Sequence, residues 1–482
     1  MSRSSFEWQV GGESGEWETI AEIGKKKPRR RAPWWVWAAL AGVLLASAGI
    51  GYLVLRERVE KLNEQIAFQI QAVIDLEERA WNRGDVSTYL ALQDDSDLKW
   101  YTEQAQIIQF KIEAENTFLL NVPLSARVQN VNVQGDVAWV ETHEENALGP
   151  VRRMRFYRKT TRGWLHTAPD PAFWGQAIEY HYGDQLIFRF RKRDQPYVEP
   201  AIDALGEAFY EICRTVGCAS GFKYEINVVD GYLPGGIGLN TTIVLSPWIS
   251  GIPLEGEWSE TMISSALYVL AFNVPQAQFS GASVHSSAPL CQAIIDEYAV
   301  WMSTHDLAQA PLLGRVIARH GERVLPQVFE YLKSSPTQSA FLSRWLALPP
   351  PAGSEQAALY FETLLNIEQE AAVAQRLSTF QLLQDDQDGV WTSYQNERFN
   401  RIGLERDGIT LTPVQVRDIQ VQNVTAVMSI NSNPLLHSRA VAVFRLRDDG
   451  WKRNDFVSTS YQLSGAHAPT PTVVPTPTPR PQ

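Results

Sequence analysis

One uncharged apolar segment constrains this chain more than any other feature. Residues 34–55 carry no charged side chain over 22 positions, and a helix of that length spans roughly 33 Å at about 1.5 Å per residue. This length matches a bilayer hydrocarbon core of about 30 Å. The tryptophans Trp34, Trp35 and Trp37 at its start favour the headgroup layer. The sequence therefore predicts a transmembrane helix over residues 33–55, with the lipid bilayer as a partner.

The charges on either side of this segment indicate its orientation. Six basic residues lie within residues 25–31, whereas three lie within residues 56–61, among glutamates. Basic flanks stay in the cytoplasm, so residues 1–32 are predicted to form a disordered cytoplasmic tail. The protein would then be a single-pass protein of the cell membrane with an extracytoplasmic ectodomain. A cleaved signal peptide is the alternative, because residues 46–48, Ala-Ser-Ala, have the pattern of a cleavage site.

Composition argues against several classes of protein. Hydrophobic residues make up 44% and charged residues 20%, which is normal for a globular chain. The net charge of −11 argues against nucleic acid as a partner. Three cysteines are too few for a four-cysteine zinc site. Frequent proline predicts that residues 466–482 form an extended disordered tail, either plain or glycosylated.

Residues 57–83 carry apolar side chains at close to heptad spacing and predict a helix. A short stripe of this kind suits the packed face of one domain, and a coiled-coil dimer is the alternative. The oligomeric state is therefore left open by the sequence.

A short internal repeat follows this helix. Residues 157–164 read aromatic-Arg, a turn and Gly-Trp, and residues 444–451 read the same way. Each motif comes after a helical stretch with an acidic break and after residues that alternate with period two, as strands do. Residues 56–175 and 370–465 are therefore predicted to be two copies of one α+β unit.

The stretch RFYRKTTRGWLHTAPDPAFWG, residues 155–175, resembles the NTF2-like fold. In that fold a helix closes over a cone-shaped sheet and forms a pocket; some members are enzymes, and many only bind or dimerise. The titratable candidates for the first pocket are His143, His166, Asp94 and Asp95. We interpret the two aspartates as part of a solvated loop and His166 as a structural histidine with its hydrogen bonds satisfied.

Residues 180–365 are predicted to form a third, central α+β unit. Strands are expected at residues 185–190, 223–229 and 241–245, and helices at residues 198–215, 261–272 and 290–305. No G-x-S-x-G and no glycine-rich nucleotide motif occurs, so Ser283 and His285 are read as parts of a polar loop.

The central unit resembles the catalytic half of gluzincin, or peptidase MA-like, zinc metallopeptidases. Ser246-Pro247, Gly251-Ile252-Pro253 and IIDEYAVWMS at residues 294–303 carry the resemblance. That family holds zinc with the two histidines of HExxH, whose glutamate is the general base, and with a glutamate from a second helix. Here residues 261–272 contain no histidine. Glu297 matches the position of the third ligand but lacks partners, so the resemblance implies a pseudopeptidase without catalytic residues, metal or cofactor.

Alternatives stay open for a possible metal site and for the three cysteines. His285 and Cys291 could rebuild a metal site with Glu297, although we expect Glu297 to pair with an arginine or to cap a chain end. Cys213 and Cys218 are five residues apart and could form a small disulfide outside the cytoplasm or remain two buried thiols. Cys291 is expected to be buried as a small apolar side chain.

These patterns together predict a multidomain α+β protein in which two NTF2-like units flank a degenerate peptidase. The expected function is non-catalytic binding or scaffolding of a protein or peptide outside the cytoplasm, because the scaffold is kept while the hydrolytic groups are missing. An active zinc peptidase with atypical ligands is one alternative. The other is a small-molecule sensor or enzyme, which would bring a carboxylate and a histidine together in a deep NTF2-like pocket.

Overall fold

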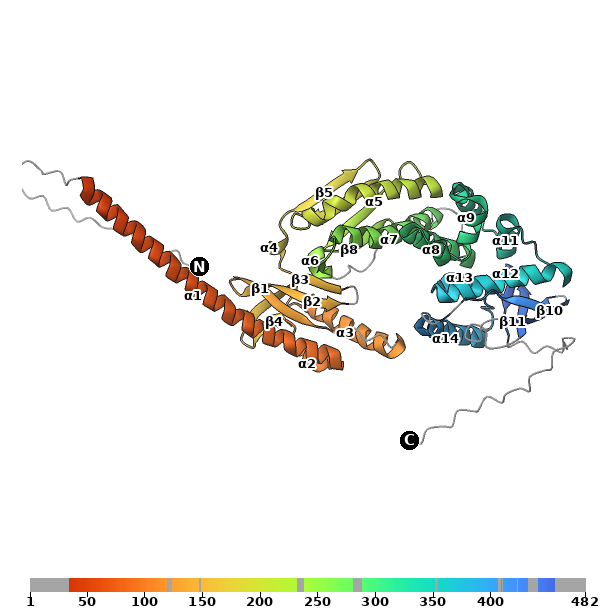
Figure 1. Cartoon of the computed structure of the whole chain (residues 1–482), viewed down its shortest axis with the longest axis horizontal. Helices are drawn as coiled ribbons and strands as arrows, with labels where there is room; N and C mark the ends of the chain where they lie inside the picture. Colours follow the sequence, from red (N-terminus) through yellow and green to blue (C-terminus); the bar gives the residue numbers. More distant parts are fainter. Residues whose placement is uncertain are drawn as a thin grey trace, which may run out of the picture. The chain divides into compact units, whose positions relative to one another are not determined.

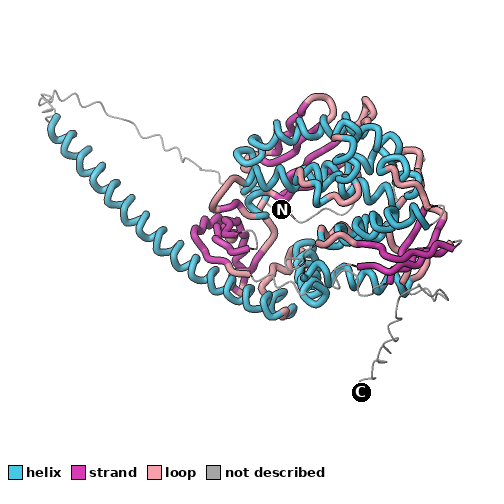
Figure 2. The backbone as a smooth tube through the Cα atoms, turned by 45° about the vertical axis from the view of Figure 1, so that its right-hand side comes forward, coloured by secondary structure: helices cyan, strands magenta, loops and turns pink. Residues whose placement is uncertain are grey.

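The computed structural model describes residues 34–118, 124–146, 149–231, 238–280, 288–351, 354–405, 409, 411–422, 424–431 and 441–455. The chain divides into two compact units, residues 1–64 and 65–482. Helix α1 (Trp34–Arg83) begins in the first unit and ends in the second (Figure 1). The second unit combines many helices with strands in three separate sheets (Figure 2). The predicted multidomain α+β class is therefore confirmed.

The structure describes the backbone of the predicted membrane segment from residue 34 but only some of its side chains. Among the residues that are described, no helix is long and apolar enough to cross a bilayer. The predicted tails, residues 1–32 and 466–482, lie outside the described residues, and so do many side chains of residues 33–55.

The first sheet is an antiparallel meander preceded by helices. Its strands are β1 (Ala126–Gln134), β2 (Val137–Asn146), β3 (Gly149–Thr160) and β4 (Gly163–His166), and α2 (Val86–Ala91) and α3 (Leu98–Phe118) come before them. Gly135 turns the chain between β1 and β2 at a positive φ of 66°, which glycine adopts without a steric cost. The apolar stripe Ile66, Ile70 and Ile74 of α1 packs on this sheet. This part of the stripe is thus the packed face of a domain, whereas Val59, Leu62 and Leu76 of the predicted stripe are exposed.

The central sheet contains a parallel crossover. Its order is β5 (Ala177–Tyr182), β6 (Leu186–Arg191), β7 (Tyr224–Val229) and β8 (Thr241–Leu245), with β5 antiparallel to β6 and the other pairs parallel. Helix α5 (Gln195–Val216) connects β6 to β7, as a parallel pair requires. The short strand β9 (Ile252–Pro253) pairs instead with β3 of the first sheet.

The remaining helices of the central part pack in two apolar clusters: α4 (Pro171–Trp174) and α6 (Pro247–Ser250) join the first sheet, and most of the others share one large core with α5 and the central sheet. The others are α7 (Trp258–Ser280), α8 (Pro289–Thr304), η1 (Leu307–Gln309), α9 (Leu313–His320), η2 (Glu322–Val324), α10 (Leu325–Leu332) and α11 (Gln338–Leu346). The helices and strands expected from the sequence in this part are present, with ends shifted by a few residues, or by eight at the end of α7.

The third sheet is again an antiparallel meander preceded by helices. The helices are α12 (Ser354–Val373), α13 (Leu377–Leu382) and α14 (Gly389–Glu405), and the strands are β10 (Gln415–Gln422), β11 (Thr425–Asn431), β12 (Val441–Arg447) and β13 (Gly450–Arg453). On α12, Glu362 accepts a hydrogen bond from the backbone N–H of Val416 on β10 at 2.8 Å. Helix α12 therefore belongs with the third sheet, although it crosses the predicted boundary at residues 365–370.

The first and third sheets with their helices repeat one arrangement, called here the first repeat (residues 65–167) and the second repeat (residues 354–455). Each has helices, a four-stranded meander and one irregularity in the first strand pair, after Val128 and after Val416. A helix side chain accepts a hydrogen bond from the N–H at that position in both, and Gln71 does so in the first repeat at 2.8 Å. The isolated parallel bridge between Gln93 and His166 in the first repeat corresponds to the bridge between Gln384 and Arg453 in the second. The repeat thus extends far beyond the short motif.

Candidate functional site

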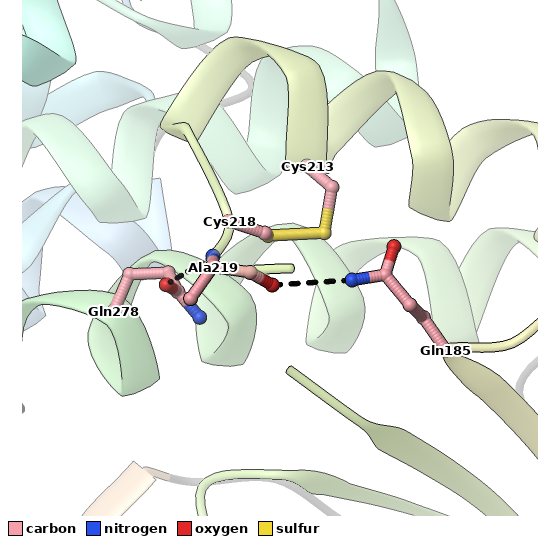
Figure 3. Close-up of a disulfide and its surroundings, with 5 residues drawn as sticks. All are labelled: Gln185, Cys213, Cys218, Ala219 and Gln278. Carbon is pink, nitrogen blue, oxygen red and sulfur yellow. Dashed lines mark hydrogen bonds between the residues drawn. A yellow bond between two sulfur atoms is a disulfide. The ribbon is translucent and has the colours of Figure 1, made fainter. Parts of the chain in front are cut away.

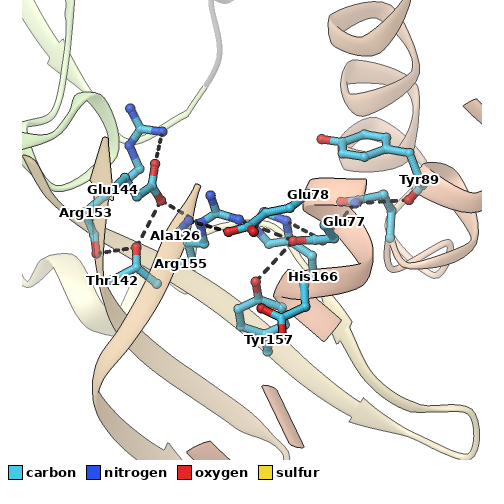
Figure 4. A network of polar contacts seen from close by, with 12 residues as sticks. Glu77, Glu78, Tyr89, Ala126, Thr142, Glu144, Arg153, Arg155, Tyr157 and His166 are labelled. Carbon is cyan, nitrogen blue, oxygen red and sulfur yellow. Dashed lines mark hydrogen bonds and ion pairs between the residues drawn. The ribbon is translucent and has the colours of Figure 1, made fainter. Parts of the chain in front are cut away.

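The first repeat buries a carboxylate, Glu77, between α1 and the sheet. Glu77 is 1% exposed. Its Oε1 atom lies 3.1 Å from His166 Nδ1 and accepts a hydrogen bond from Gln93 Nε2 at 3.1 Å. Its Oε2 atom accepts from Arg155 Nη1 and from the hydroxyl of Tyr157, both at 3.3 Å. Figure 4 shows these side chains converging from α1, β3 and β4. A buried carboxylate and a histidine therefore meet in this repeat.

A second buried carboxylate extends the network along the sheet. Glu144 on β2 accepts hydrogen bonds from Arg155 Nε and Arg153 Nη1, both at 2.8 Å (Figure 4). Arg153, Arg155 and Tyr157 project from the same face of β3, because strand side chains alternate. His166 is paired with Tyr157 across β3 and β4. Local strand geometry is thus enough to collect these groups on one side of the sheet.

The charges in this network stabilise one another. Burial alone raises the pKa of Glu77, but the charge and hydrogen bond of His166 and the charge of Arg155 outweigh it and lower that pKa. Burial also raises the pKa of Glu144, but the charges of Arg155 and Arg153 outweigh burial and lower that pKa. Burial and the neighbouring Glu77 raise the pKa of Tyr157 well above its usual value. Both carboxylates are therefore ionised near neutral pH, and Tyr157 keeps its proton.

A cavity of about 230 Å³ opens beside this network. Aromatic and apolar side chains form much of its lining, including Trp81, Tyr89, Trp100, Ile107 and Phe156. The polar part of the lining includes Glu77, His166, Gln104 and Arg153. Gln104 Nε2 and Arg153 Nε are buried donors without a hydrogen-bond partner among the described residues. The cavity thus combines aromatic walls with unsatisfied hydrogen-bond donors, as sites for small ligands do.

The second repeat fills the equivalent place with its own side chains. Glu368 stands at the position of Glu77 and accepts hydrogen bonds from Arg398 Nη1 at 2.9 Å and from Arg453 Nη1 at 2.7 Å. Arg398 occupies the position of Ile107, and Arg453 that of His166. Both arginines are almost completely buried, at 3% and 2% exposure. An open cavity is therefore a property of the first repeat and not a necessary consequence of this arrangement.

Only one of the four titratable candidates for the first pocket lines the cavity, and it is His166. Its ring stacks on Tyr157 with centroids 5.1 Å apart. Asp94 is buried and accepts hydrogen bonds from Arg158 Nη1 at 2.8 Å and from the Thr167 hydroxyl at 2.9 Å, so it joins the loop after α2 to the sheet.

The other two candidates lie apart from the cavity. Asp95 is exposed and pairs with Arg162, and His143 on β2 is absent from the lining. The expectation of a solvated loop thus holds for Asp95 and fails for Asp94, because Arg158 and Thr167 cover its carboxylate.

Sequence reasoning missed Glu77, Glu144 and Arg155. A signal for Glu77 was present, because it falls on the apolar stripe of residues 57–83, where a carboxylate requires a partner. A signal for Arg155 was also present in the alternation Arg153, Arg155, Tyr157 on one strand. Which carboxylate meets which arginine depends on the packing of α1 against the sheet and could not be read from the sequence.

Glu297, the residue at the family's third-ligand position, is completely buried on α8 and hydrogen-bonded on both oxygens. Oε2 accepts from the backbone N–H groups of Leu312 and Leu313 at 2.8 and 2.6 Å. Oε1 accepts from the hydroxyl of Thr379 on α13. Burial raises the pKa of Glu297 to about 7, despite these three donors. Glu297 thus caps the start of α9 and connects it to the second repeat.

Helices α7 and α8 pack against each other, and Tyr268 donates a hydrogen bond to Asp296 Oδ1 between them at 3.0 Å. Within the described ranges, no three His, Cys, Asp or Glu side chains come together as metal ligands would. Cys291 is buried, and burial raises the pKa of its thiol to about 12. Ser283 and His285 lie outside the described residues.

Cys213 and Cys218 form a disulfide (Figure 3). Gly217 ends α5 in the left-handed region at φ 77°, which a glycine adopts readily. The chain reverses there and brings the two cysteine Cα atoms within 4.9 Å, well inside the range that a disulfide can span.

Comparison of the chain with protein-family models, curated proteins and solved structures returns no match. The resemblances to the NTF2-like and gluzincin families therefore remain predictions, and the function has to be argued from the geometry.

Proposed function

We propose that this chain is a membrane-anchored, extracytoplasmic binding protein whose first repeat holds a small polar ligand. One observation carries the proposal: the cavity beside Glu77 and His166 is open in the first repeat, and the equivalent place in the second repeat is filled by Arg398 and Arg453. A cavity that one copy closes and the other leaves open, with buried donors facing it, is more consistent with ligand binding than with a packing defect.

The electrostatics of Glu77 and Tyr157 suit ligand binding better than proton transfer by these two groups. A general acid or base works best when its pKa lies near the working pH. The pKa of Glu77 is lowered and that of Tyr157 is raised, so each keeps one protonation state near neutral pH. Glu77 is also held by hydrogen bonds to groups on β3, β4 and the loop after α2. A fixed carboxylate of this kind suits the orientation of a ligand.

The ligand must be small and must offer hydrogen-bond acceptors. The cavity of about 230 Å³ is below the range of roughly 300–1,000 Å³ that holds drug-sized molecules. The unpaired groups of the lining, Gln104 Nε2 and Arg153 Nε, are both donors. A compact molecule with carbonyl or hydroxyl oxygens would accept hydrogen bonds from these donors. A flat apolar part of the same molecule would contact Trp81 and Trp100.

The remaining parts of the proposal rest on the sequence together with the fold. A helix over a four-stranded meander in each repeat supports two NTF2-like units. The absence of histidine from residues 261–272 and the use of Glu297 as a cap support a central pseudopeptidase. The asymmetry of basic residues around residues 33–55 supports a cytoplasmic N-terminus. Protease treatment of intact cells tests the orientation, and an ectodomain that stays uncut would refute it.

The ligand site is tested by closing the cavity as the second repeat does. Full-length protein in detergent is screened by thermal shift against small neutral and anionic fragments, and each hit is repeated on Ile107→Arg and on Gln106→Arg. Gln106 is the exposed neighbour of Ile107 on α3, so it controls for the added charge. We expect hits on the wild type that Ile107→Arg loses and Gln106→Arg keeps. A screen without hits, or hits that survive Ile107→Arg, would contradict the proposal.

A further inference from the structure

A second cavity, of about 330 Å³, lies between α8 and the helices α13 and α14 of the second repeat. Its lining differs in kind from that of the first cavity. Carboxamide side chains dominate it: Gln292, Gln381, Gln384, Gln395 and Asn396. Ser378 and Thr392 add two hydroxyl groups, and Asp386 at the exposed rim is the one ionisable side chain among the described residues that line it. We infer that this amide pocket binds the main chain of an extended, uncharged peptide segment.

The chemistry of the lining selects the ligand. A carboxamide offers two N–H donors and one carbonyl acceptor, which is the complement of a peptide group. A phosphate or carboxylate ligand would find no cationic partner in this lining, because no lysine, arginine or histidine belongs to the described residues that form it. An apolar ligand would meet few apolar side chains, since Pro289 and Leu382 are the ones present. A neutral ligand with alternating donors and acceptors fits best.

One buried acceptor in the wall points to a missing donor. Gln384 is 3% exposed, and its Nε2 donates to the backbone oxygen of Phe380 at 3.3 Å. Its Oε1 is buried and has no hydrogen-bond partner among the described residues. Buried acceptors are nearly always paired in folded proteins. A peptide N–H entering the amide pocket would supply the donor that Gln384 lacks. The equivalent Gln93 of the first repeat also has a buried Oε1 without a partner among the described residues, so this acceptor supports the inference only together with the carboxamide lining.

The first repeat shows that this polarity is not required by the arrangement of helices. Gln381 donates to Asn396 Oδ1 at 3.1 Å across α13 and α14. The equivalent residues of the first repeat are Leu90 and Ala105, which cannot hydrogen-bond through their side chains. An apolar pair is therefore compatible with the same helix contact, and Gln381 and Asn396 need another explanation, whereas Gln384 and Gln395 have the carboxamide counterparts Gln93 and Gln104. Binding of a polar ligand supplies it.

Continuation onto α8 gives the amide pocket a second wall. Gln292 accepts a hydrogen bond from Gln276 Nε2 at 3.1 Å and lines the cavity from α8. A peptide in this cavity would thus meet carboxamides from α8 as well as from α13 and α14. This site is separate from the cavity of the first repeat, and its inference stands whether or not that cavity binds a small molecule.

The test measures binding of a neutral probe to the full-length protein. Acetyl-tetraalanine amide at millimolar concentration is followed by saturation-transfer NMR, because a few hydrogen bonds give affinities of about that order. The test variant Gln381→Leu/Asn396→Ala restores the side chains of the first repeat. The control variant Gln387→Leu/Asn400→Ala makes the same changes at exposed positions outside the lining. Gln292→Leu on α8 is a second, independent test variant.

We expect saturable binding of the probe that both test variants weaken about tenfold or more and the control variant leaves unchanged. Ile107→Arg in the first cavity should also leave it unchanged, which separates this inference from the proposed function. Absence of saturable binding by the wild type would overturn the inference. So would wild-type affinity in Gln381→Leu/Asn396→Ala. Preferential binding of N-acetylglucosamine tetramer through the same residues would replace the peptide with a neutral saccharide.

Discussion

Replacing Glu297 by glutamine should make the protein more stable at alkaline pH. The pKa of Glu297 is raised from 4.5 to about 7 by burial. One pKa unit corresponds to about 1.4 kcal/mol, so ionising Glu297 in the folded state costs about 3 kcal/mol. The folded state binds the extra proton between these pKa values. Its contribution to stability is therefore fully present below about pH 4.5 and is lost as the pH rises through about 7.

Glutamine preserves the geometry without the ionisation. Its carbonyl oxygen can accept from Leu312 and Leu313, and its amide can donate to the Thr379 hydroxyl. We therefore expect Glu297→Gln to lie within about 1 kcal/mol of the wild type at pH 5 and to exceed it by up to about 3 kcal/mol at pH 8. The assay is denaturant unfolding of the full-length protein between pH 5 and 8, read at the transition that includes α8.

The matched control for this experiment is Glu260→Gln. Glu260 is exposed at the start of α7, so its replacement should leave the pH profile unchanged. A Glu297→Gln variant that is less stable than the wild type at pH 8 would refute the reasoning. It would mean that the three donors around the carboxylate outweigh its burial.

Three further predictions follow from other contacts. Arg155→Met leaves the buried Glu77 and Glu144 with less compensation and should cost about 3–5 kcal/mol of unfolding free energy, whereas Arg162→Met, at an exposed pair with Asp95, should cost less than about 1 kcal/mol; equal losses in denaturant titrations would contradict the assigned network. The Cys213→Ser/Cys218→Ser variant should lose about 2 kcal/mol, the value expected for closing so short a loop, and a reductant should lower the stability of the wild type by the same amount while leaving the variant unaffected. Metal analysis of the purified protein should find no stoichiometric zinc. One zinc ion per chain, removed by a chelator together with a peptidase activity, would refute the pseudopeptidase.

Much of the secondary structure could be predicted because it depends on local periodicity. Apolar spacing placed α5, α7 and α8, and period-two alternation placed the strands around Gly135 and Gly163. The motif at residues 157–164 and 444–451 predicted a repeat from a few residues on strands and turns. Contacts between segments were harder to foresee. Strand β9 joins the first sheet through pairing with β3, and a two-residue strand has no periodicity to reveal it.

In the candidate sites, too, local features could be predicted from the sequence and contacts between distant segments could not. His166 could be named from the sequence, since ionisable side chains on strands near a predicted pocket are few. Asp94 looked like part of a solvated loop because nothing nearby in the sequence indicates that Arg158 and Thr167 cover it. Glu297 was expected to act as a cap or ion-pair partner, and the specific donors, Leu312, Leu313 and Thr379, come from segments that no local rule connects to α8.

The amino-acid order alone accounts for whatever depends on neighbours along the chain. That includes the uncharged span before residue 56, the helical and strand segments, the repeated motif and the lack of histidine in residues 261–272. Folding in three dimensions decided which buried charges meet, because the partners of Glu77 and Glu297 lie 15 to 89 residues away along the chain. It also decided that one repeat keeps an open cavity while the other closes it with arginines, since cavity volume depends on all the surrounding side chains together.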